Sequence, residues 1–209
     1  MQDCATSSYV VTPSIKRIFN VLDELRAGGY IVEGDTNCLI TGESGSGKSE
    51  LVKRYADKYP RQEFDEYTYI PVLHVELKSP KSDKAFAEQI ILAMTGSLEG
   101  RTIKSKDDGY KLIGKLCREC RTELIVLDEV QTVIQNRSQG VIANISDWFK
   151  DLMRATAIPV VLVGMPWCLG FVEDYDQLDT RVGYRHYLET FRVSQQFGHF
   201  MKFIDLFSK

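Results

Sequence analysis

The hydrophobic and polar positions near the start of the chain follow a helical period. Apolar side chains recur three or four residues apart at Ile15, Ile18, Phe19, Leu22 and Leu25. Thr12 followed by Pro13 is typical of a helix N-cap with proline at the first helical position, and Gly28-Gly29 is a stop signal. The pattern therefore predicts an amphipathic helix between these signals, packed on a folded domain.

Further along, short apolar runs alternate with helical patterns. The runs predict strands at residues 37–41, 70–77, 124–127 and 159–163, with 187–193 a candidate for a fifth. Helical patterns cover residues 50–59, 82–95, 110–120 and 142–155, and the polar segment 96–109 is expected to be a loop. Continuous aliphatic strands are typical of a parallel sheet that is buried on both faces. The alternation predicts an α/β sandwich that binds its ligand at the carboxyl ends of the strands.

A last helical pattern begins at residue 195 and runs to the end of the chain. Its apolar positions have no partner helices to cover them. We expect the start of an incomplete helical domain in a trimmed chain, with a swapped or oligomer-forming helix as the alternative. The expected organisation is an N-terminal lead and helix at 1–30, a nucleotide-binding domain at 31–194 and the start of a helical lid at 195–209.

The segment after the first predicted strand is nearly free of bulky side chains. It reads GESGSGKS and fits the pattern G-x-x-x-x-G-K-[ST]. Glycines let backbone N–H groups approach a phosphate closely, and a helix start adds free N–H groups and the positive end of its dipole. The sequence therefore predicts a cradle for the triphosphate of ATP, formed by Gly42, Glu43, Ser44, Gly45, Ser46, Gly47, Lys48 and Ser49.

Two side chains of this cradle and two acids elsewhere carry the expected chemistry. Lys48 is expected to reach the β- and γ-phosphates, and Ser49 to hold Mg²⁺ through its hydroxyl. The third predicted strand ends in LIVLDEVQ, where Asp128 can hold the metal opposite Ser49. Glu129 follows and can orient or deprotonate an attacking water. The pair favours a Mg²⁺-dependent ATPase over a small-molecule kinase, which would need an acceptor pocket and its own base.

Composition limits the partners and the compartment. The net charge is −3 with a pI near 5.7, so any nucleic acid must be bound by a local patch or an oligomer surface. The sequence contains no run of 18 apolar residues and no apolar leader, so secretion and membrane spanning are not expected. Five irregularly spaced cysteines suit a reducing cytoplasm better than a disulfide framework.

The two motifs and the strand–helix order resemble the AAA+ ATPases of the P-loop NTPase class, over residues 12 to 195. The resemblance implies a three-layer sandwich with a parallel five-stranded sheet in the order 5-1-4-3-2, followed by a helical lid. It also implies active sites between neighbouring subunits of a homo-oligomer. There an arginine of one protomer reaches the γ-phosphate bound by the next. Arg181 is the candidate for that arginine, with Arg185 as the second choice.

Within that class, the order of short matches is similar to the transposition ATPases of the TniB and TnsC type. The matching segments are YVVTPSIKRIFNVLDEL, PVLHVELKSP, AFAEQIILAMTG, IPVVLVGMP and QLDTRVGYRHYLETF. This resemblance implies a bacterial or phage-like regulator that assembles with ATP on double-stranded DNA. It would pass the site to a transposase and a target-selection protein, and disassemble on hydrolysis. One departure is Met165, which stands where the family usually carries a hydrogen-bonding γ-phosphate sensor.

Contact with DNA is expected at two groups of basic residues. Lys78, Lys81 and Lys84 surround the end of the second predicted strand, and Arg101, Lys104 and Lys106 lie in the following loop. Such residues can neutralise phosphates lining an oligomer pore, although loop lysines are commonly just solvated. Two alternatives stay open: another initiator or helicase-loader-like AAA+ protein, and a scaffold NTPase that uses nucleotide as a switch.

Overall fold

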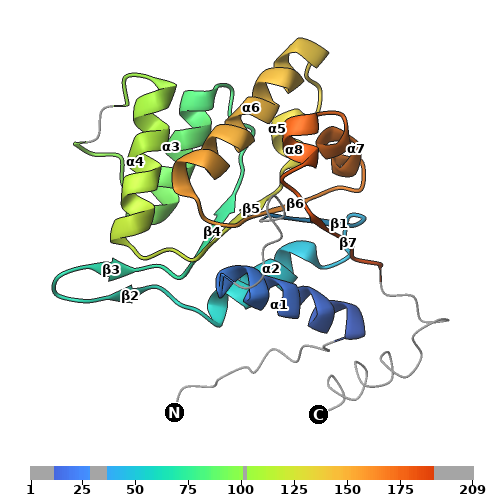
Figure 1. Ribbon diagram of the computed structural model, residues 1–209, viewed down its shortest axis with the longest axis horizontal. Helices are drawn as coiled ribbons and strands as arrows, with labels where there is room; N and C mark the ends of the chain where they lie inside the picture. Colours follow the sequence, from blue (N-terminus) through green and yellow to red (C-terminus); the bar gives the residue numbers. More distant parts are fainter. Residues whose placement is uncertain (1–11, 29–36, 101–102, 191–209) are drawn as a thin grey trace.

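A parallel sheet between two layers of helices forms the body of the protein (Figure 1). The computed structural model describes residues 12–28, 37–100 and 103–190. The sheet has five strands in the order β4-β5-β6-β1-β7, and every pairing in it is parallel. The strands are β1 (Cys38–Thr41), β4 (Val72–Glu76), β5 (Leu124–Asp128), β6 (Val160–Gly164) and β7 (Tyr184–Tyr187). Counted along this sheet, the order is the expected 5-1-4-3-2, which confirms the P-loop NTPase fold.

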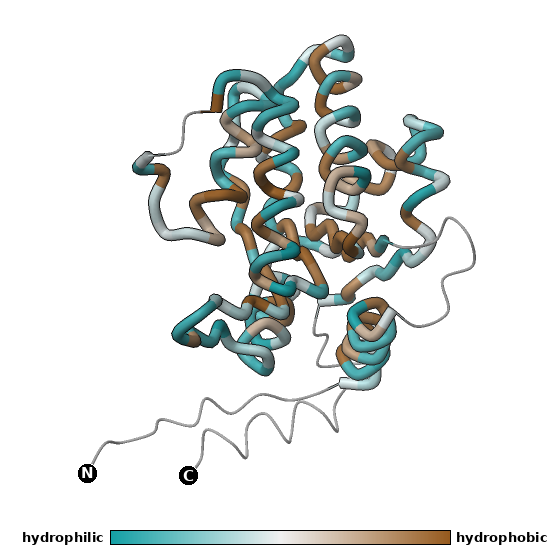
Figure 2. Tube along the Cα trace, turned by 60° about the vertical axis from the view of Figure 1, so that its left-hand side comes forward, coloured by the Kyte–Doolittle hydropathy of each residue, from teal (hydrophilic) through white to brown (hydrophobic). Residues whose placement is uncertain are grey.

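Alternate residues of β1, β4, β5 and β6 belong to different cores, because helices cover both faces of the sheet. In β6, Val160 and Leu162 join one hydrophobic cluster while Val161 and Val163 join the other. The first cluster is covered by α3 (Asp83–Thr95), α4 (Lys106–Glu119), α6 (Gln139–Thr156) and α7 (Cys168–Glu173). The second is covered by α1 (Pro13–Arg26) and α2 (Lys48–Asp57). The tube in Figure 2 shows hydrophobic residues concentrated between these layers. Two-sided burial explains the continuous apolar runs of the strands.

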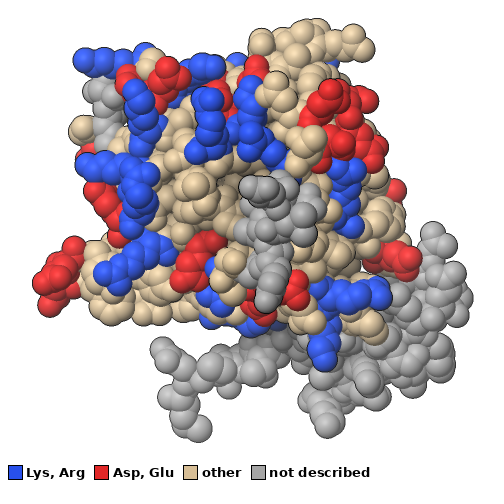
Figure 3. Space-filling model, viewed as in Figure 1, with Lys and Arg blue, Asp and Glu red and all other residues tan. Residues whose placement is uncertain are grey.

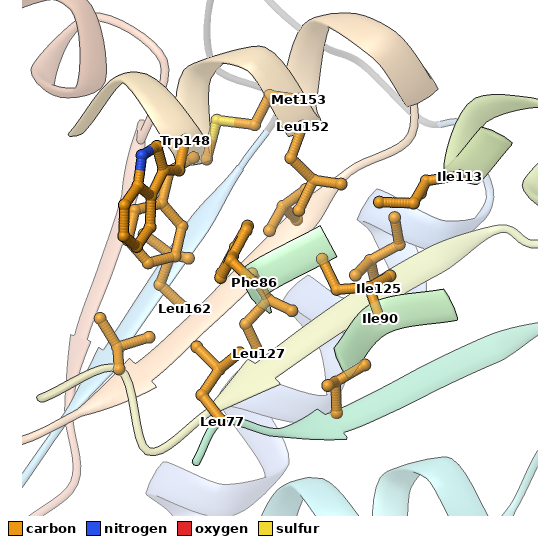
Figure 4. Close-up of a cluster of buried hydrophobic side chains, with 14 of the residues drawn as sticks. Leu77, Phe86, Ile90, Ile113, Ile125, Leu127, Trp148, Leu152, Met153 and Leu162 are labelled. Carbon is orange, nitrogen blue, oxygen red and sulfur yellow. The ribbon is translucent and has the colours of Figure 1, made fainter. Parts of the chain in front are cut away.

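Aromatic side chains fill the larger of the two cores. Phe86 of α3 packs edge-on against Phe149 of α6, with ring centroids 5.3 Å apart, and Trp148 lies 5.9 Å from Phe86. Figure 4 shows Phe86, Trp148 and Leu152 directed toward Leu127 and Leu162 of the sheet. This packing fixes α3 and α6 over the strands that carry the candidate site.

The expected N-terminal helix is confirmed as α1. The hydroxyl of Thr12 accepts a hydrogen bond from the N–H of Ile15, and proline occupies the first turn. Its buried residues pack with α2 in one cluster, so α1 belongs to the same body as the sheet. Whether 1–30 forms a separate unit stays a prediction, since residues 1–11 and 29–36 lie outside the described parts.

Several boundaries differ from the sequence expectation. The fifth strand is Tyr184–Tyr187 and not 187–193, since it pairs with β1 from Cys38↔Tyr184 onward. It is an edge strand that alternates half-buried and exposed residues, so it lacks the apolar run that marks the other strands. The segment expected to be a loop at 96–109 ends earlier, because Ser105 caps α4 and accepts from the N–H of Asp108.

Five short elements were not anticipated, among them α7. The strands β2 (Gln62–Glu63) and β3 (Thr68–Tyr69) form a small antiparallel hairpin, and the other short helices are α5 (Gln131–Ile134) and α8 (Asp176–Asp179). Elements of two to six residues are too short to show a clear hydrophobic period. Residues 191–209, including the expected lid, lie outside the described residues, and so does Arg101. In the described part of the chain, no helix is long and apolar enough to cross a membrane.

Candidate functional site

The glycine-rich segment connects the end of β1 to the start of α2. Gly45 and Gly47 have positive φ angles of 76° and 89°, in the left-handed region that glycine adopts without strain. Gly42 lies against the chain after β7, where an added Cβ would stand 2.5 Å from the carbonyl oxygen of Leu188. Glycine is thus needed at these positions for the turn and for the close approach of two backbone segments.

The N-terminus of α2 is open. Gly47 is its N-cap and offers no side-chain acceptor, whereas the side chains of Thr12, Ser82 and Ser105 cap α1, α3 and α4. The first N–H groups of α2 therefore have no capping side chain, and the positive end of the helix dipole lies beside them. Glu43, Ser44 and Ser49 are exposed around this end, and Ser46 is half-buried.

Lys48 is the first residue of α2, and its long side chain folds back beneath the loop. Its Nζ donates to the carbonyl oxygens of Gly42 at 2.7 Å and Glu43 at 2.8 Å. Burial lowers the pKa of Lys48, and the negative charges of Asp128 and Glu129 oppose that shift. The ammonium group therefore lies within the electrostatic reach of both predicted acids.

Asp128 is the last residue of β5 and its side chain is buried. Its Oδ1 accepts from the N–H of Glu129 at 2.8 Å, and its Oδ2 lies 3.8 Å from Nε2 of His74 in the neighbouring strand β4. Burial alone would raise the pKa of Asp128, but His74, the hydroxyl of Ser49 and the N–H of Glu129 together hold it below the ordinary value. The carboxylate is thus kept charged next to Ser49.

Glu129 begins the turn that follows β5. Its φ of 61° lies in the left-handed region, which is costly for a residue with a side chain and is often found at functional sites. Burial and the adjacent Asp128 raise the pKa of Glu129, while Lys48 lowers it. The structure therefore brings together Lys48, Ser49, Asp128 and Glu129 at the carboxyl edge of the sheet, as the sequence predicted.

Three further residues of this site were not singled out from the sequence. Nε2 of Gln131 donates to Oε2 of Glu129 at 2.6 Å, and the hydroxyl of Thr132 lies 2.8 Å from the carbonyl oxygen of Glu129. His74 contacts Asp128 from the next strand. Gln131 and Thr132 follow the acids directly, so their proximity to Glu129 was a usable signal. His74 is 54 positions from Asp128, and only the strand pairing brings them together.

The residues present fit a nucleotide with Mg²⁺. An open helix N-terminus and a glycine loop suit a phosphate chain, and Lys48 adds a positive charge beside them. Among the described residues, no group of three or more His, Cys, Asp or Glu side chains could hold a metal by itself. Mg²⁺ is commonly held by one or two protein oxygens together with substrate phosphates, a requirement that Ser49 and Asp128 meet.

Of the two candidate arginines, Arg181 lies near the amino-terminal ends of the strands, opposite the glycine loop, whereas Arg185 lies within the edge strand β7, in register with Leu39. The carbonyl oxygen of Arg181 accepts from Nδ2 of Asn37, which precedes β1, and the side chain of Arg181 is exposed. The length of β1, roughly 13 Å for four residues at about 3.3 Å each, separates Arg181 from the glycine loop. Arg185 is held by Asp179, at 2.6 Å, and by Glu173, at 3.4 Å. Neither arginine is therefore part of the site within its own chain.

The predicted DNA-contacting residues are spread over several elements. Lys78, Lys81 and Lys104 lie in connecting segments, Lys84 pairs with Glu88 in α3, and Lys106 pairs with Asp151. Figure 3 shows lysine and arginine side chains gathered over the region of α3 and α4, with acidic side chains among them. Arg101 lies outside the described residues, and the contact of all six predicted residues with DNA stays a prediction.

A comparison of the sequence with protein-family models agrees with a nucleotide-binding site of this kind. The family described as bacterial TniB protein matches residues 1–191. The chain belongs to the TniB family. Among curated proteins, none matches the sequence significantly.

Solved structures share the fold at low sequence identity. An ORC2 protein from Aeropyrum pernix, in ADPNP and ADP complexes, superposes with a TM-score of 0.62 at 13% identity, over 98% of this chain and 55% of that one. Cdc6p from Pyrobaculum aerophilum superposes with a TM-score of 0.60 at 16% identity, over 94% of this chain and 51% of that one. An Aeropyrum pernix ORC1 protein in complex with DNA superposes with a TM-score of 0.57 at 17% identity, over 97% of this chain and 52% of that one. This TniB-family chain thus spans about half the length of these chains.

Proposed function

We propose that this TniB-family protein is a Mg²⁺-dependent ATPase that regulates DNA transposition. It assembles with ATP on double-stranded DNA, presents that site to a transposase and a target-selection protein, and leaves the DNA after hydrolysis. The observation that carries the proposal is the meeting of Lys48 and Ser49 with Asp128 and Glu129 at one edge of the sheet. Family membership supplies the transposition context.

Each residue of the site has a task in this account. The loop N–H groups and Lys48 bind the phosphates, and Lys48 offsets negative charge that develops on the transferred phosphoryl group. Ser49 and Asp128 would hold the metal, which would supply positive charge to neutralise the phosphates. Glu129 orients the attacking water and accepts its proton, a role that its raised pKa suits. A nucleotide complex of the similar ORC2 fold supports ATP as the substrate.

The position of Arg181 supports hydrolysis between protomers. Because Arg181 lies at the amino-terminal ends of its own strands, away from its own glycine loop, we assign it to a γ-phosphate bound by a neighbouring copy. Its exposed side chain suits this role better than Arg185, which is engaged by Asp179 and Glu173. Assembly would therefore complete the active site and couple hydrolysis to oligomer formation.

A second candidate function is that of an initiator-like or helicase-loading AAA+ protein. The shared fold with an ORC1 protein solved in complex with DNA favours it. This alternative uses the same site residues and differs in the partner that the assembled protein recruits. The helicase-loading account predicts that a replicative helicase, and not a transposase, is retained on the protein–DNA assembly.

Assembly on DNA tests the proposal directly. Light scattering and electron microscopy would compare the full chain on double-stranded DNA with ATP, with ADP and without nucleotide, at one fixed salt concentration. The proposal predicts ordered assemblies with ATP alone, and their loss in Arg181→Ala. Lys115→Ala, at an exposed lysine of α4, serves as the control and should assemble like the wild type. Tight ATP binding without any assembly on DNA would contradict the proposal and favour a nucleotide switch.

A further inference from the structure

Gln131 joins the candidate catalytic acid to the end of a different strand. It is the first residue of α5, two positions after Glu129. Its Nε2 donates to Oε2 of Glu129 at 2.6 Å, and its Oε1 accepts from the backbone N–H of Met165 at 3.3 Å. Because the amide nitrogen faces a carboxylate and the amide oxygen faces an N–H group, both ends of this side chain are matched to their partners.

The last residue of β6 makes room for this contact. Gly164 ends the strand, and an added Cβ there would lie 3.1 Å from Oε1 of Gln131 and 2.8 Å from Sγ of Cys168. A side chain at this position would therefore push the amide away from the strand end. The side chain of Met165 packs partly buried against the larger core, so this residue contributes its backbone N–H to the site.

The backbone around Glu129 is already fixed by other contacts. Its N–H donates to Asp128, and its carbonyl oxygen lies 2.8 Å from the hydroxyl of Thr132. That hydroxyl also accepts from the N–H of Ser79, in the segment after β4. With the left-handed backbone held in this way, the orientation of the carboxylate depends on its side-chain torsions, and Gln131 is the group that holds its end.

We propose that Gln131 is a positioning residue for hydrolysis, which holds the Glu129 carboxylate in one orientation and ties that orientation to the end of β6. This inference rests on the proposed ATPase function. One carboxylate oxygen accepts from Gln131, so the other is left to orient water. This link also accounts for Met165, whose side chain cannot donate a hydrogen bond. The end of β6 is connected to Glu129 through the backbone N–H of Met165 and the side chain of Gln131, so no hydrogen-bonding side chain is needed at position 165.

Steady-state hydrolysis by the full chain tests the role. Gln131→Met keeps an unbranched side chain of similar length and removes both hydrogen bonds. We expect kcat to fall about 10- to 100-fold, the range found when supporting partners of active-site ligands are lost. The Kd for ATP should stay within about threefold, since Gln131 acts on Glu129 and not on the phosphates. Gln62→Met, at an exposed residue of β2, should leave kcat and Kd unchanged.

A double variant separates positioning from a purely structural effect. If Gln131 acts through Glu129, adding Gln131→Met to Glu129→Gln should cause no further loss of single-turnover rate. Losses that multiply, or a kcat of Gln131→Met equal to that of the wild type, would overturn the role of Gln131 while leaving the ATPase intact. A wild type that releases phosphate no faster than Glu129→Gln would overturn the ATPase proposal and the role of Gln131 with it.

Discussion

The Nζ of Lys48 lies 2.7 Å from the carbonyl oxygen of Gly42, six residues earlier in the chain. The same ammonium group donates to Glu43 and is buried beneath the loop that both residues belong to. The first residue of α2 therefore stabilises the loop that would hold the phosphates, in addition to offering them its charge.

Replacing this lysine should weaken nucleotide binding. For Lys48→Met we expect a Kd for ATP that is about 10- to 100-fold higher, because charge-assisted hydrogen bonds contribute about 1.5–3 kcal/mol each. Titration calorimetry would measure it. Lys53→Met changes an exposed lysine of the same helix and should bind ATP like the wild type. Equal affinities of Lys48→Met and the wild type would remove Lys48 from the site.

Alanine substitutions at two glycines should change the free energy of unfolding in opposite directions. Gly42→Ala would place a Cβ 2.5 Å from a backbone oxygen, and we expect it to lower the free energy of unfolding by about 1–3 kcal/mol. Gly140 lies in α6 with nothing within 4 Å of an added Cβ, so Gly140→Ala should raise it by up to about 1 kcal/mol. Urea unfolding measures both, and a stabilised Gly42→Ala would contradict the close approach to Leu188.

The ion pair between Arg26 and Glu123 should matter more for stability than exposed pairs do. The pair is 2.6 Å long, Tyr69 donates a second hydrogen bond to Glu123, and Arg26 lies 3.8 Å above the ring of Tyr59. We expect Glu123→Gln to lower the free energy of unfolding by about 1 kcal/mol.

Glu119→Gln is the matched control for that pair. Its ion-pair partner Lys115 lies 3.6 Å away and has a side chain that is 65% exposed. The loss in free energy of unfolding should therefore stay below about 0.5 kcal/mol. Equal losses in the two variants, measured by urea unfolding, would show that the connection between α1 and β5 adds nothing beyond a surface pair.

His186 should make stability depend on pH near neutrality. Burial and the positive charge of Arg17 lower the pKa of this histidine. The unfolded chain then binds the proton more readily than the folded one, so stability is full above about pH 6.5 and is lost as pH falls toward the folded-state pKa. His186→Gln should flatten the fall in free energy of unfolding between about pH 7.5 and 5.5. Parallel curves for the two proteins would contradict this.

The sequence predicted the phosphate loop and the acidic pair because each is local. The loop depends on glycines and a lysine within eight consecutive residues, and Asp128 and Glu129 follow a run whose burial is visible in its composition. The order of the sheet came from the resemblance to AAA+ proteins, since periodicity alone does not order strands. The confirmed order shows that these local motifs were placed in the right architecture.

What the sequence missed depends on contacts between distant segments or on weak patterns. The link from Gln131 to Met165 joins residues 34 positions apart, and it forms only because β5 and β6 are neighbours. The edge strand β7 was predicted too late in the chain, because the polar residues Arg185 and His186 interrupt the apolar pattern. Neither the hydrogen bond from Gln131 to Met165 nor the strand β7 produces a sequence pattern that differs from that of an ordinary surface segment.

The persistence of assemblies formed by Glu129→Gln tests the central claim most directly. Wild-type and variant protein would be assembled on double-stranded DNA with ATP, and light scattering and phosphate release would be followed together after the free ATP is removed. Glu119→Gln, at an exposed acid of α4, is the control. We predict that Glu129→Gln binds ATP, releases phosphate about 100-fold or more slowly and stays on the DNA while the wild type and the control dissociate. Equal lifetimes of the variant and wild-type assemblies would contradict a regulator that hydrolysis at Glu129 releases from DNA.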